Sequence, residues 1–378
     1  MNKLSKKLAA VGVCICMAAT TLTGCGAKAD TTVATLDGEN VEYGVASFMV
    51  RYSQASMQSM YGSYMGTDYW QNYGEQTKTS TMDSLQQMLI LEKHMDEYNL
   101  TVSDEEKEAI SAAAKEFMES NEKSVTKALA VTEETVNRVL TLYTIQNKMS
   151  EAIVADVDTE VSDEEAAQKT IKYGFFSTAD SKDADGNTAA LTDDEKTAIK
   201  EQAQQVLDAL KAGDDLSTAL TAVDEEKTVS EASYGTDNGD LPDEVKEAAD
   251  KLEDGEYTDS VIETDTGYYV VQMVSTFDKE ATESQKETIV SQRKSDKFDE
   301  VYEAWKEEVT FTIDDKVLAK LTFIDIYEVK TTEAETEAET SAETNAETSS
   351  ETSAETSAET SSETSAEVTE AGTEATTE

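Results

Sequence analysis

The stretch KLEDGEYTDSVIETDTGYYVVQMV, residues 251–274, decides the fold of the middle of this chain. Turn residues occur at Asp254-Gly255 and again at residues 265–267. After the second turn, aromatic and β-branched residues alternate between two faces, which is the period of a half-buried strand. We therefore predict two strands, residues 257–263 and 268–274. Because two strands are marginally stable alone, other segments must complete a sheet and cover it.

Length and charge limit the classes of protein that this chain can represent. Its 378 residues are enough for two domains. The formal net charge is −49, from 80 acidic and 31 basic residues. Such a charge repels nucleic acids and anionic lipid surfaces, so we expect neither as a partner, whereas unfolded cationic polypeptides are compatible with it. The oligomeric state does not follow from the sequence.

The first 25 residues have the pattern of an export signal. Lys3, Lys6 and Lys7 precede an apolar run, residues 8–22, of signal-peptide length. The run ends in Leu-Thr-Gly-Cys at residues 22–25, which resembles the lipobox of bacterial lipoproteins. That resemblance implies that Cys25 is lipidated and holds the protein on the extracytoplasmic face of the cell membrane. The alternative is an ordinary signal peptide with a chance cysteine. All three cysteines lie within these 25 residues, so the body of the protein has no disulfide.

Residues 33–165 are predicted to be mainly helical. A short strand pair turns at Asp37-Gly38, and helical periodicity then covers residues 43–64 and 80–98. Three further helices are expected to begin at Ser103, Thr132 and Ser162, each followed by acidic residues that suit the first turn of a helix. The lone histidine of the chain lies in this segment and is interpreted as structural.

The end of the first long helix is unusually rich in methionine and tyrosine. One interpretation is a helix facing the core, followed by an aromatic-rich loop. The other is an adaptable surface that binds unfolded segments, because methionine repacks around irregular shapes. The candidate client-binding residues are Met57, Met60, Tyr61, Tyr64, Met65, Tyr69, Trp70 and Tyr73.

The central part of the chain alternates strands with helices. We expect a strand at residues 171–176, helices at 195–212, 216–223 and 243–252, and a loop at 228–242. Gly213 is the expected C-cap of the first of these helices. The run Asp183-Ala184-Asp185-Gly186 is similar to part of a calcium loop, but the flanking ligand positions do not fit, so it is interpreted as a turn. No metal or cofactor is expected.

This order of elements resembles the parvulin-type (PpiC-type) peptidyl-prolyl isomerases. The resemblance is carried by LKAGDDL at residues 210–216, Gly-Asp-Leu at 239–241, LEDGE at 252–256 and TDTGYYVV at 264–271. With the lipobox and the preceding helices, the chain is similar to PrsA/SurA-type extracytoplasmic foldases over about 300 residues. The family implies binding of unfolded or newly exported proteins.

The chain departs from that family at the residues associated with activity. Active parvulins carry one histidine in the first strand and one in the last, and the corresponding positions here are Tyr173 and Tyr269. Isomerase activity is therefore uncertain: the domain is either inactive or weak, or tyrosine hydroxyls replace the imidazoles. The resemblance identifies the candidate isomerase-like pocket as Tyr173, Glu231, Ala232, Val245, Thr266 and Tyr269.

The C-terminal part predicts a long helix, residues 282–309, followed by a strand at 309–313. The resemblance to the foldase family implies that this segment returns to the N-terminal helical domain. The helix could also be independent, but an apolar stripe of this length favours a partner. Residues 331–378 contain 14 Glu, no Lys or Arg, and repeated Ser-Ala-Glu-Thr. This composition cannot bury enough surface to fold and predicts a disordered acidic tail.

The sequence thus predicts an α+β protein with a mostly helical chaperone lobe and an inserted parvulin-like domain of a small β-sheet plus helices. The expected function is that of a membrane-anchored foldase or chaperone for exported proteins. The alternatives are an active prolyl isomerase, and a structural or solute-binding envelope lipoprotein. The expected segments are a signal peptide (1–24), a tether (25–32), the N-terminal helical lobe (33–165), the parvulin-like domain (166–278), a C-terminal helix and strand completing the helical lobe (279–330), and the tail (331–378).

Overall fold

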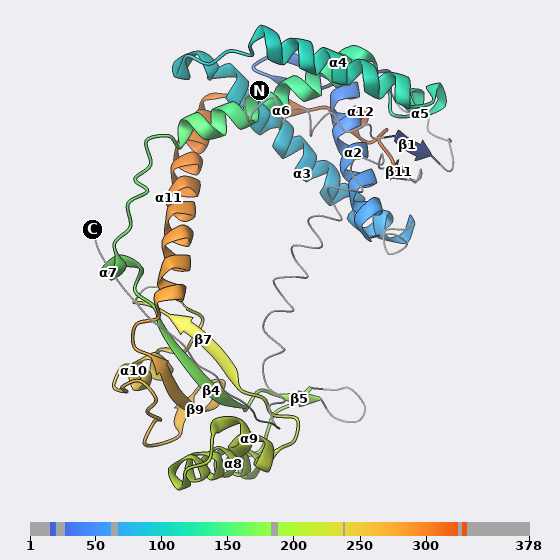
Figure 1. Ribbon diagram of the computed structural model, residues 1–378. Helices are drawn as coiled ribbons and strands as arrows, with labels where there is room; N and C mark the ends of the chain where they lie inside the picture. Colours follow the sequence, from blue (N-terminus) through green and yellow to red (C-terminus); the bar gives the residue numbers. More distant parts are fainter. Residues whose placement is uncertain are drawn as a thin grey trace, which may run out of the picture. The chain divides into compact units, whose positions relative to one another are not determined.

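The structure is a computed structural model that describes residues 16–19, 27–61, 67–182, 188–236, 239–323 and 327–330. The chain forms two compact units (Figure 1). The first unit comprises Met1–Asn147 and Val309–Glu378, and the second comprises Lys148–Glu308. Helices dominate, and the described strands form small antiparallel sheets, so the predicted α+β class is confirmed.

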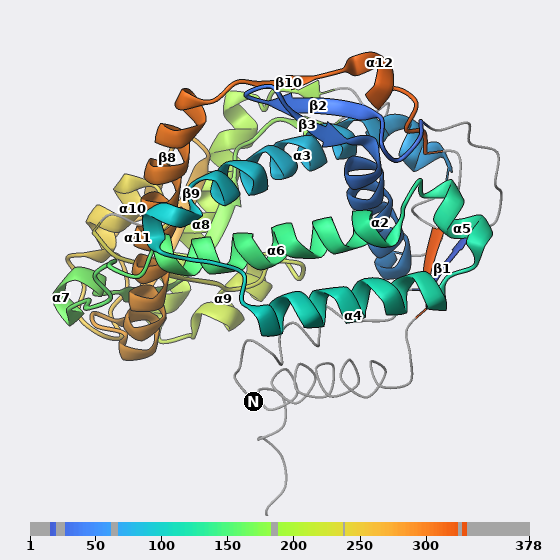
Figure 2. The same ribbon diagram turned by 90° about the horizontal axis from the view of Figure 1, so that it is seen from above.

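The first unit is mainly helical. Its β2, β3 and β10 form one sheet in the order β10-β2-β3, and they lie together near α12 in Figure 2. β1 lies in the predicted signal peptide and pairs with β11. The elements are β1 (Cys16–Ala19), β2 (Thr32–Leu36), β3 (Glu39–Glu42), α2 (Tyr43–Tyr61), α3 (Thr67–Lys93), the 3-10 helix η2 (Met95–Tyr98), α4 (Asp104–Ser120), α5 (Lys123–Ala128), α6 (Glu133–Ile153, which continues into the second unit), β10 (Phe311–Ile313), α12 (Asp315–Leu318) and β11 (Tyr327–Lys330).

The β2–β3 hairpin receives a strand from the far end of the sequence. Asp37 and Gly38 both have positive φ, 49° and 86°, as a tight two-residue hairpin turn requires. β10 pairs antiparallel with β2, so that Phe311 lies opposite Leu36. The Thr310 amide donates a 2.8 Å hydrogen bond to the Asp37 carboxylate. The segment that follows residue 308 therefore packs in the first unit.

Helix starts in the first unit follow the expected capping chemistry. The Ser103 hydroxyl accepts from the Glu106 amide, and the Glu106 carboxylate accepts from the Ser103 amide at 2.7 Å. These two bonds form a capping box at the helix start that was predicted for Ser103. At the start of α6, the Thr135 amide donates to the Thr132 hydroxyl. These bonds satisfy amides that have no partner within the first turn of a helix.

The second unit contains an antiparallel sheet in the order β7-β4-β9-β8. Helices α8 and α9 pack on one face and α10 on the other. The elements are α7 (Asp163–Ala166), β4 (Lys169–Ser177), β5 (Ser181–Lys182), β6 (Thr188–Ala189), α8 (Asp193–Ala212), α9 (Leu216–Val223), β7 (Ser230–Tyr234), α10 (Asp243–Ala249), β8 (Ile262–Thr264), β9 (Gly267–Ser275) and α11 (Lys279–Glu308).

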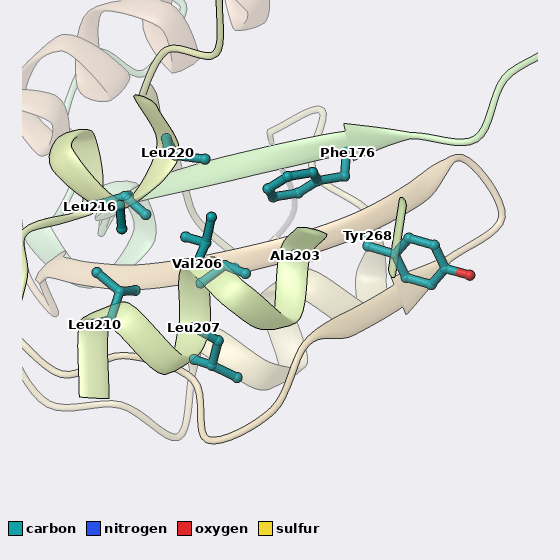
Figure 3. Packing of buried hydrophobic residues seen from close by; sticks show 10 residues of the cluster. Phe176, Ala203, Val206, Leu207, Leu210, Leu216, Leu220 and Tyr268 are labelled. Carbon is teal, nitrogen blue, oxygen red and sulfur yellow. The ribbon is translucent and has the colours of Figure 1, made fainter. Parts of the chain in front are cut away.

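β9 is buried on both faces, whereas its alternating sequence predicted a half-buried strand. Tyr268 and Val270 pack with Phe176 and the helices α8 and α9 (Figure 3). Tyr269 and Val271 pack on the opposite face with α10. The prediction was wrong because a central strand with helices on both sides needs apolar residues at successive positions. Gly213 ends α8 with φ 108°, as predicted for its C-cap.

Three local predictions differ from the structure. The predicted loop at residues 228–242 contains β7, an edge strand poor in β-branched residues, which pairs with β4. The predicted strand at 257–263 is reduced to β8, with an isolated bridge from Tyr257 to Gln272. The predicted aromatic-rich loop continues as helix from Thr67, so α3 is 27 residues long. Tertiary packing outweighs local propensity in each segment.

Helix α11 clusters with the second unit, although the sequence assigned all of residues 279–330 to the helical lobe. Arg293 donates to the Glu165 carboxylate at 2.6 Å and to two carbonyls of the segment before α7. Lys286 donates to the Asp163 carboxylate at 2.5 Å. These bonds tie α11 to residues 158–165, and the division between the units falls at residues 308 and 309.

The Asp278 carboxylate caps the start of α11, and we expect its contribution to stability to depend on pH. Its carboxylate accepts from the amides of Ala281 and Glu280 at 3.0 Å and from the Thr170 hydroxyl at 2.7 Å. These bonds, led by that from the Ala281 amide, hold the pKa of Asp278 below its ordinary value. We expect Asp278→Ala to lower the free energy of unfolding by about 1–2 kcal/mol, the usual cost of losing an N-cap.

The pH dependence of that cost has a definite sign. Because the folded pKa is lowered, the stabilisation by Asp278 is complete above the unfolded value, near pH 4, and is lost as the pH falls through the folded pKa. Urea unfolding at pH 7 and at pH 3 measures the difference between wild type and Asp278→Ala. The exposed neighbour Glu280 provides the control, Glu280→Ala, which should cost little at either pH. An undiminished Asp278→Ala effect at pH 3 would contradict the assignment.

Candidate functional site

Two of the predicted pocket residues, Tyr173 and Tyr269, meet on the face of the sheet covered by α10. Tyr173 on β4 lies opposite Val271, and Tyr269 on β9 lies opposite Phe175. The two tyrosines are therefore diagonal neighbours on one face. Their ring centroids are 5.6 Å apart at an interplanar angle of 42°. The structure thus brings together two residues that the sequence analysis assigned to one candidate pocket.

The space around these tyrosines is occupied by apolar side chains. The Phe175 ring lies 4.6 Å from that of Tyr269, which is only 7% exposed. Val245 of α10 is fully buried in the same cluster, and Ala232 of β7 packs against it. The arrangement offers aromatic faces and two phenol groups that could donate hydrogen bonds, and no imidazole.

Glu231 and Thr266 lie away from this cluster. Glu231 precedes Ala232 on β7, so its side chain points to the opposite face, where it forms a 3.5 Å ion pair with Lys172. Thr266 is exposed in the turn between β8 and β9, and its hydroxyl lies 3.1 Å from that of Thr264. Of the six predicted pocket residues, the structure therefore groups Tyr173, Ala232, Val245 and Tyr269.

The sequence did not indicate a partly exposed polar network beside this cluster. The Tyr234 hydroxyl and the Lys169 ammonium each donate to Asp250 at 2.8 Å. Burial, aided by the bond to Asp250, raises the pKa of Tyr234. Burial also acts to raise the pKa of Asp250, but the bonds from Lys169 and Tyr234 outweigh it and the net pKa is lowered. The network ties the end of α10 to β4 and β7. It was missed because β7 was predicted to be a loop.

A second candidate site is a groove in the first unit, formed by α2, α3 and α6. Its volume is about 420 Å³, within the range of ligand-binding pockets. Four tyrosines and two methionines line it together with small polar side chains, and none of its lining residues is charged. The lining residues of this tyrosine groove are Met49, Tyr52, Ser53, Met57, Tyr69, Tyr73, Gln76, Thr77, Ser80, Thr81, Ser84 and Tyr143.

The predicted client-binding residues divide into four groups. Met57, Tyr69 and Tyr73 line the tyrosine groove. Met60 and Tyr61, at the end of α2, are 75% and 52% exposed. Trp70 is buried, 2% exposed, and belongs to the interior of the first unit rather than to its surface. Tyr64 and Met65 lie outside the described residues.

Two tyrosines of the groove were not predicted as binding residues. Tyr52 lies within the helix predicted for residues 43–64, and Tyr143 lies within the helix expected to begin at Thr132. In the structure both are half-buried at the groove wall. Burial, with a smaller contribution from Tyr52, raises the pKa of Tyr143. Helical periodicity in the sequence does not distinguish a core face from a groove wall.

Cys25 and the turn at residues 183–186 lie outside the described residues. Within the ranges that the structure describes, no group of three or more His, Cys, Asp or Glu side chains could hold a metal ion. None of the helices described is both long enough and apolar enough to cross a membrane.

Comparison with known proteins gives a match to a domain family and matches to several full-length relatives. Residues 175–275 match the family described as Rotamase: PPIC-type PPIASE domain. The foldase protein PrsA of Clostridium perfringens is 26% identical over 308 residues, which cover 76% of this chain and 87% of that protein. Its match spans the helical segments as well as the PPIC-type region.

Solved PrsA structures also match the chain. The foldase PrsA of Lactococcus lactis is 18% identical and covers 77% of this chain and 97% of its own, with a TM-score of 0.30. The peptidylprolyl isomerase PrsA of Bacillus cereus is 16% identical and covers 64% of this chain and 83% of its own, with a TM-score of 0.28. By its sequence matches, the chain is similar to PrsA-type foldases over most of its length and contains a parvulin-like domain of the PPIC type.

Proposed function

We propose that this protein is a membrane-anchored extracytoplasmic foldase that holds unfolded segments of exported proteins in the tyrosine groove. The observation that carries the proposal is the groove itself, an uncharged Met- and Tyr-lined wall on a chain with a net charge of −49. Similarity to PrsA foldases supports a foldase or chaperone role.

The chemistry of the groove suits weak and adaptable binding of apolar segments. Tyrosine rings give large contact areas with little loss of side-chain entropy, and methionine thioethers adapt to irregular shapes. The hydroxyls of Thr77, Thr81 and Ser84 donate to carbonyls one turn earlier in α3. These hydroxyls keep acceptor capacity toward a bound backbone. The groove can therefore receive an extended segment without a sequence-specific polar partner.

Tyr73 gives a direct test, because it lines the groove and is 50% exposed, so its replacement costs little stability. We expect Tyr73→Asp to weaken binding of a reduced, unfolded client by about tenfold or more, since a carboxylate in the groove loses hydration when the client covers it. Fluorescence anisotropy with a labelled client and suppression of client aggregation measure the change.

The matched control replaces an exposed aromatic residue of the second unit. Phe277 is 48% exposed, so Phe277→Asp introduces the same charge at a similarly exposed aromatic position outside the groove. Phe277→Asp should bind the client like wild type, and Tyr73→Phe should retain most of the affinity. Equal losses in Tyr73→Asp and Phe277→Asp would show that the groove is not the binding site.

For the parvulin-like domain we propose weak or absent isomerase activity. The cis–trans barrier of a prolyl bond, about 18–20 kcal/mol, is lowered by a slot that takes the prolyl ring and by groups that hold the twisted amide. By the resemblance to parvulins, Tyr173 and Tyr269 take the places of the two histidines. Phe175 and Val245 belong to the same apolar cluster as these tyrosines.

The alternative, an active isomerase that uses the two tyrosine hydroxyls, is favoured by their close approach and by the PPIC-type match. It predicts that the Tyr173→Phe, Tyr269→Phe double variant loses about a hundredfold or more in kcat/KM on a prolyl tetrapeptide, since a positioned catalytic donor contributes about 10²- to 10⁴-fold. If the hydroxyls have no catalytic part, wild type and the double variant turn over equally slowly.

A further inference from the structure

The two halves of α3 bury very different amounts of apolar surface. From residue 82 onward, six apolar side chains are buried: Met82, Leu85, Met88, Leu89, Ile90 and Leu91. Among the described side chains from 69 to 81, Trp70 is the one buried apolar residue, and the other buried side chains there are Lys78 and Thr81. A helical segment as short as the N-terminal half of α3 is only marginally stable unless it packs against other segments. The stability of this half therefore depends on the side chain that covers Trp70.

Phe323, from the C-terminal segment of the first unit, covers that residue. Its ring stacks on Trp70 with centroids 5.2 Å apart and planes at 7°. The ring also lies against the helix backbone at Gly74, where an added Cβ would approach Phe323 Cδ2 to 2.5 Å. The Lys78 ammonium lies 5.9 Å from the ring centroid. Trp70, Gly74 and Lys78 are four residues apart and form one stripe of α3.

The tyrosine groove uses the adjacent stripe of the same helix. Tyr69, Tyr73 and Thr77 are also four residues apart, and each precedes by one position a residue that contacts or approaches Phe323. One position corresponds to about 100° of rotation around an α-helix. The N-terminal half of α3 is thus a wall with Phe323 on one side and the groove on the other, and a displacement of the wall moves Tyr69 and Tyr73.

We propose that Phe323 is a positioning residue for the tyrosine groove and that it acts through α3. The inference rests on the proposed function of the groove. Phe323 is held in place by its own segment, since β10 pairs with β2 and Leu321 is fully buried. The groove is therefore complete only when the segment that follows residue 308 has packed in the first unit. Client binding is therefore regulated by the synthesis of the segment that follows residue 308 and by its packing in the first unit.

The test combines hydrogen exchange with client affinity in the full-length protein. In Phe323→Ala, we expect amide exchange in residues 67–81 to accelerate by about tenfold or more, with residues 82–93 and α6 still protected. The affinity of Phe323→Ala for an unfolded client should fall by a similar factor. Phe323→Tyr keeps the ring and should restore both properties.

Gly74→Ala separates positioning from helix stability. Alanine favours the helix over glycine by a factor of about five, so the substitution slows exchange in residues 67–81 if α3 is held by its own propensity. If Phe323 holds it, the new Cβ displaces the ring, and exchange accelerates as in Phe323→Ala. Slower exchange in Gly74→Ala, or unchanged client affinity in Phe323→Ala, overturns the proposal. The exchange data do not involve a client, so failure of the proposed function would appear separately, in Tyr73→Asp.

Discussion

Gly267→Ala is expected to unfold the sheet of the second unit, with a loss of about 3 kcal/mol or more in the free energy of unfolding. Gly267 begins β9 with φ 149°, and a Cβ built there would lie 2.2 Å from the Phe176 carbonyl oxygen. The obstacle is backbone, at the end of the β4–β9 pairing where Ser177 lies opposite Gly267, and it cannot rotate away as a side chain can. Either β9 shifts or its pairing with Ser177 opens. Hydrogen exchange of β4 and β9, together with urea unfolding, measures the effect.

Two other glycines provide matched controls for this prediction. Gly213 and Gly255 also have positive φ, 108° and 86°, but an added Cβ would meet no atom within 4 Å at either position. Gly213→Ala and Gly255→Ala should therefore cost only the backbone strain, about 1–2 kcal/mol. If Gly267→Ala costs no more than these controls, the close approach of β9 to β4 does not limit the side chain at this position.

Replacement of Cys25 should abolish membrane anchoring. We expect Cys25→Ala to incorporate no labelled fatty acid and, once its signal peptide has been removed by other means, to partition into the aqueous phase of a detergent separation. Each buried CH₂ of an acyl chain contributes about 0.8 kcal/mol, so loss of two chains shifts the partition by several orders of magnitude. The first unit and the second unit should fold as in wild type, because the described elements of both units from β2 to β11 follow this residue in the chain.

The other cysteines of the leader allow a strict control for lipidation. Cys14→Ala and Cys16→Ala retain the Leu-Thr-Gly-Cys motif and should be labelled and anchored like wild type. Fatty-acid labelling is the deciding measurement, because an uncleaved precursor could remain in the membrane through its apolar run. Labelling of Cys25→Ala would refute the lipobox interpretation, whatever the protein's location.

Much of the second unit could be predicted from local sequence. Helical periodicity and a C-cap glycine predicted the limits of α8 to within a few residues, and β-branched and aromatic residues marked β4 and β9. The edge strand β7 could not be found in this way. Its sequence, Ser-Glu-Ala-Ser-Tyr, has low strand propensity and is extended because β4 pairs with it. The Tyr234–Asp250 bond, which depends on β7, was hidden for the same reason.

The sequence predicted the chemical character of the candidate sites better than the positions of their side chains. The Met- and Tyr-rich composition around residues 57–73 indicated an adaptable surface, but it did not show that Trp70 points inward or that Tyr52 and Tyr143 join the groove. The resemblance assigned Glu231 and Thr266 to the candidate pocket. In the structure, the alternation of side chains along β7 turns Glu231 to the opposite face of the sheet, and Thr266 lies in the exposed turn before β9.

The sequence by itself determined the local and chemical properties of this protein: its charge, the lipobox pattern, most helix limits, the strand of residues 268–274, and tyrosine rather than histidine at residues 173 and 269. These depend on residue type and on spacings of a few positions. The tertiary structure decided which faces are covered, as with β9 between α8 and α10, and which distant residues meet, as with Phe323 and Trp70. The physical reason is that burial and strand pairing are properties of contacts between segments, and no single segment contains both partners of such a contact.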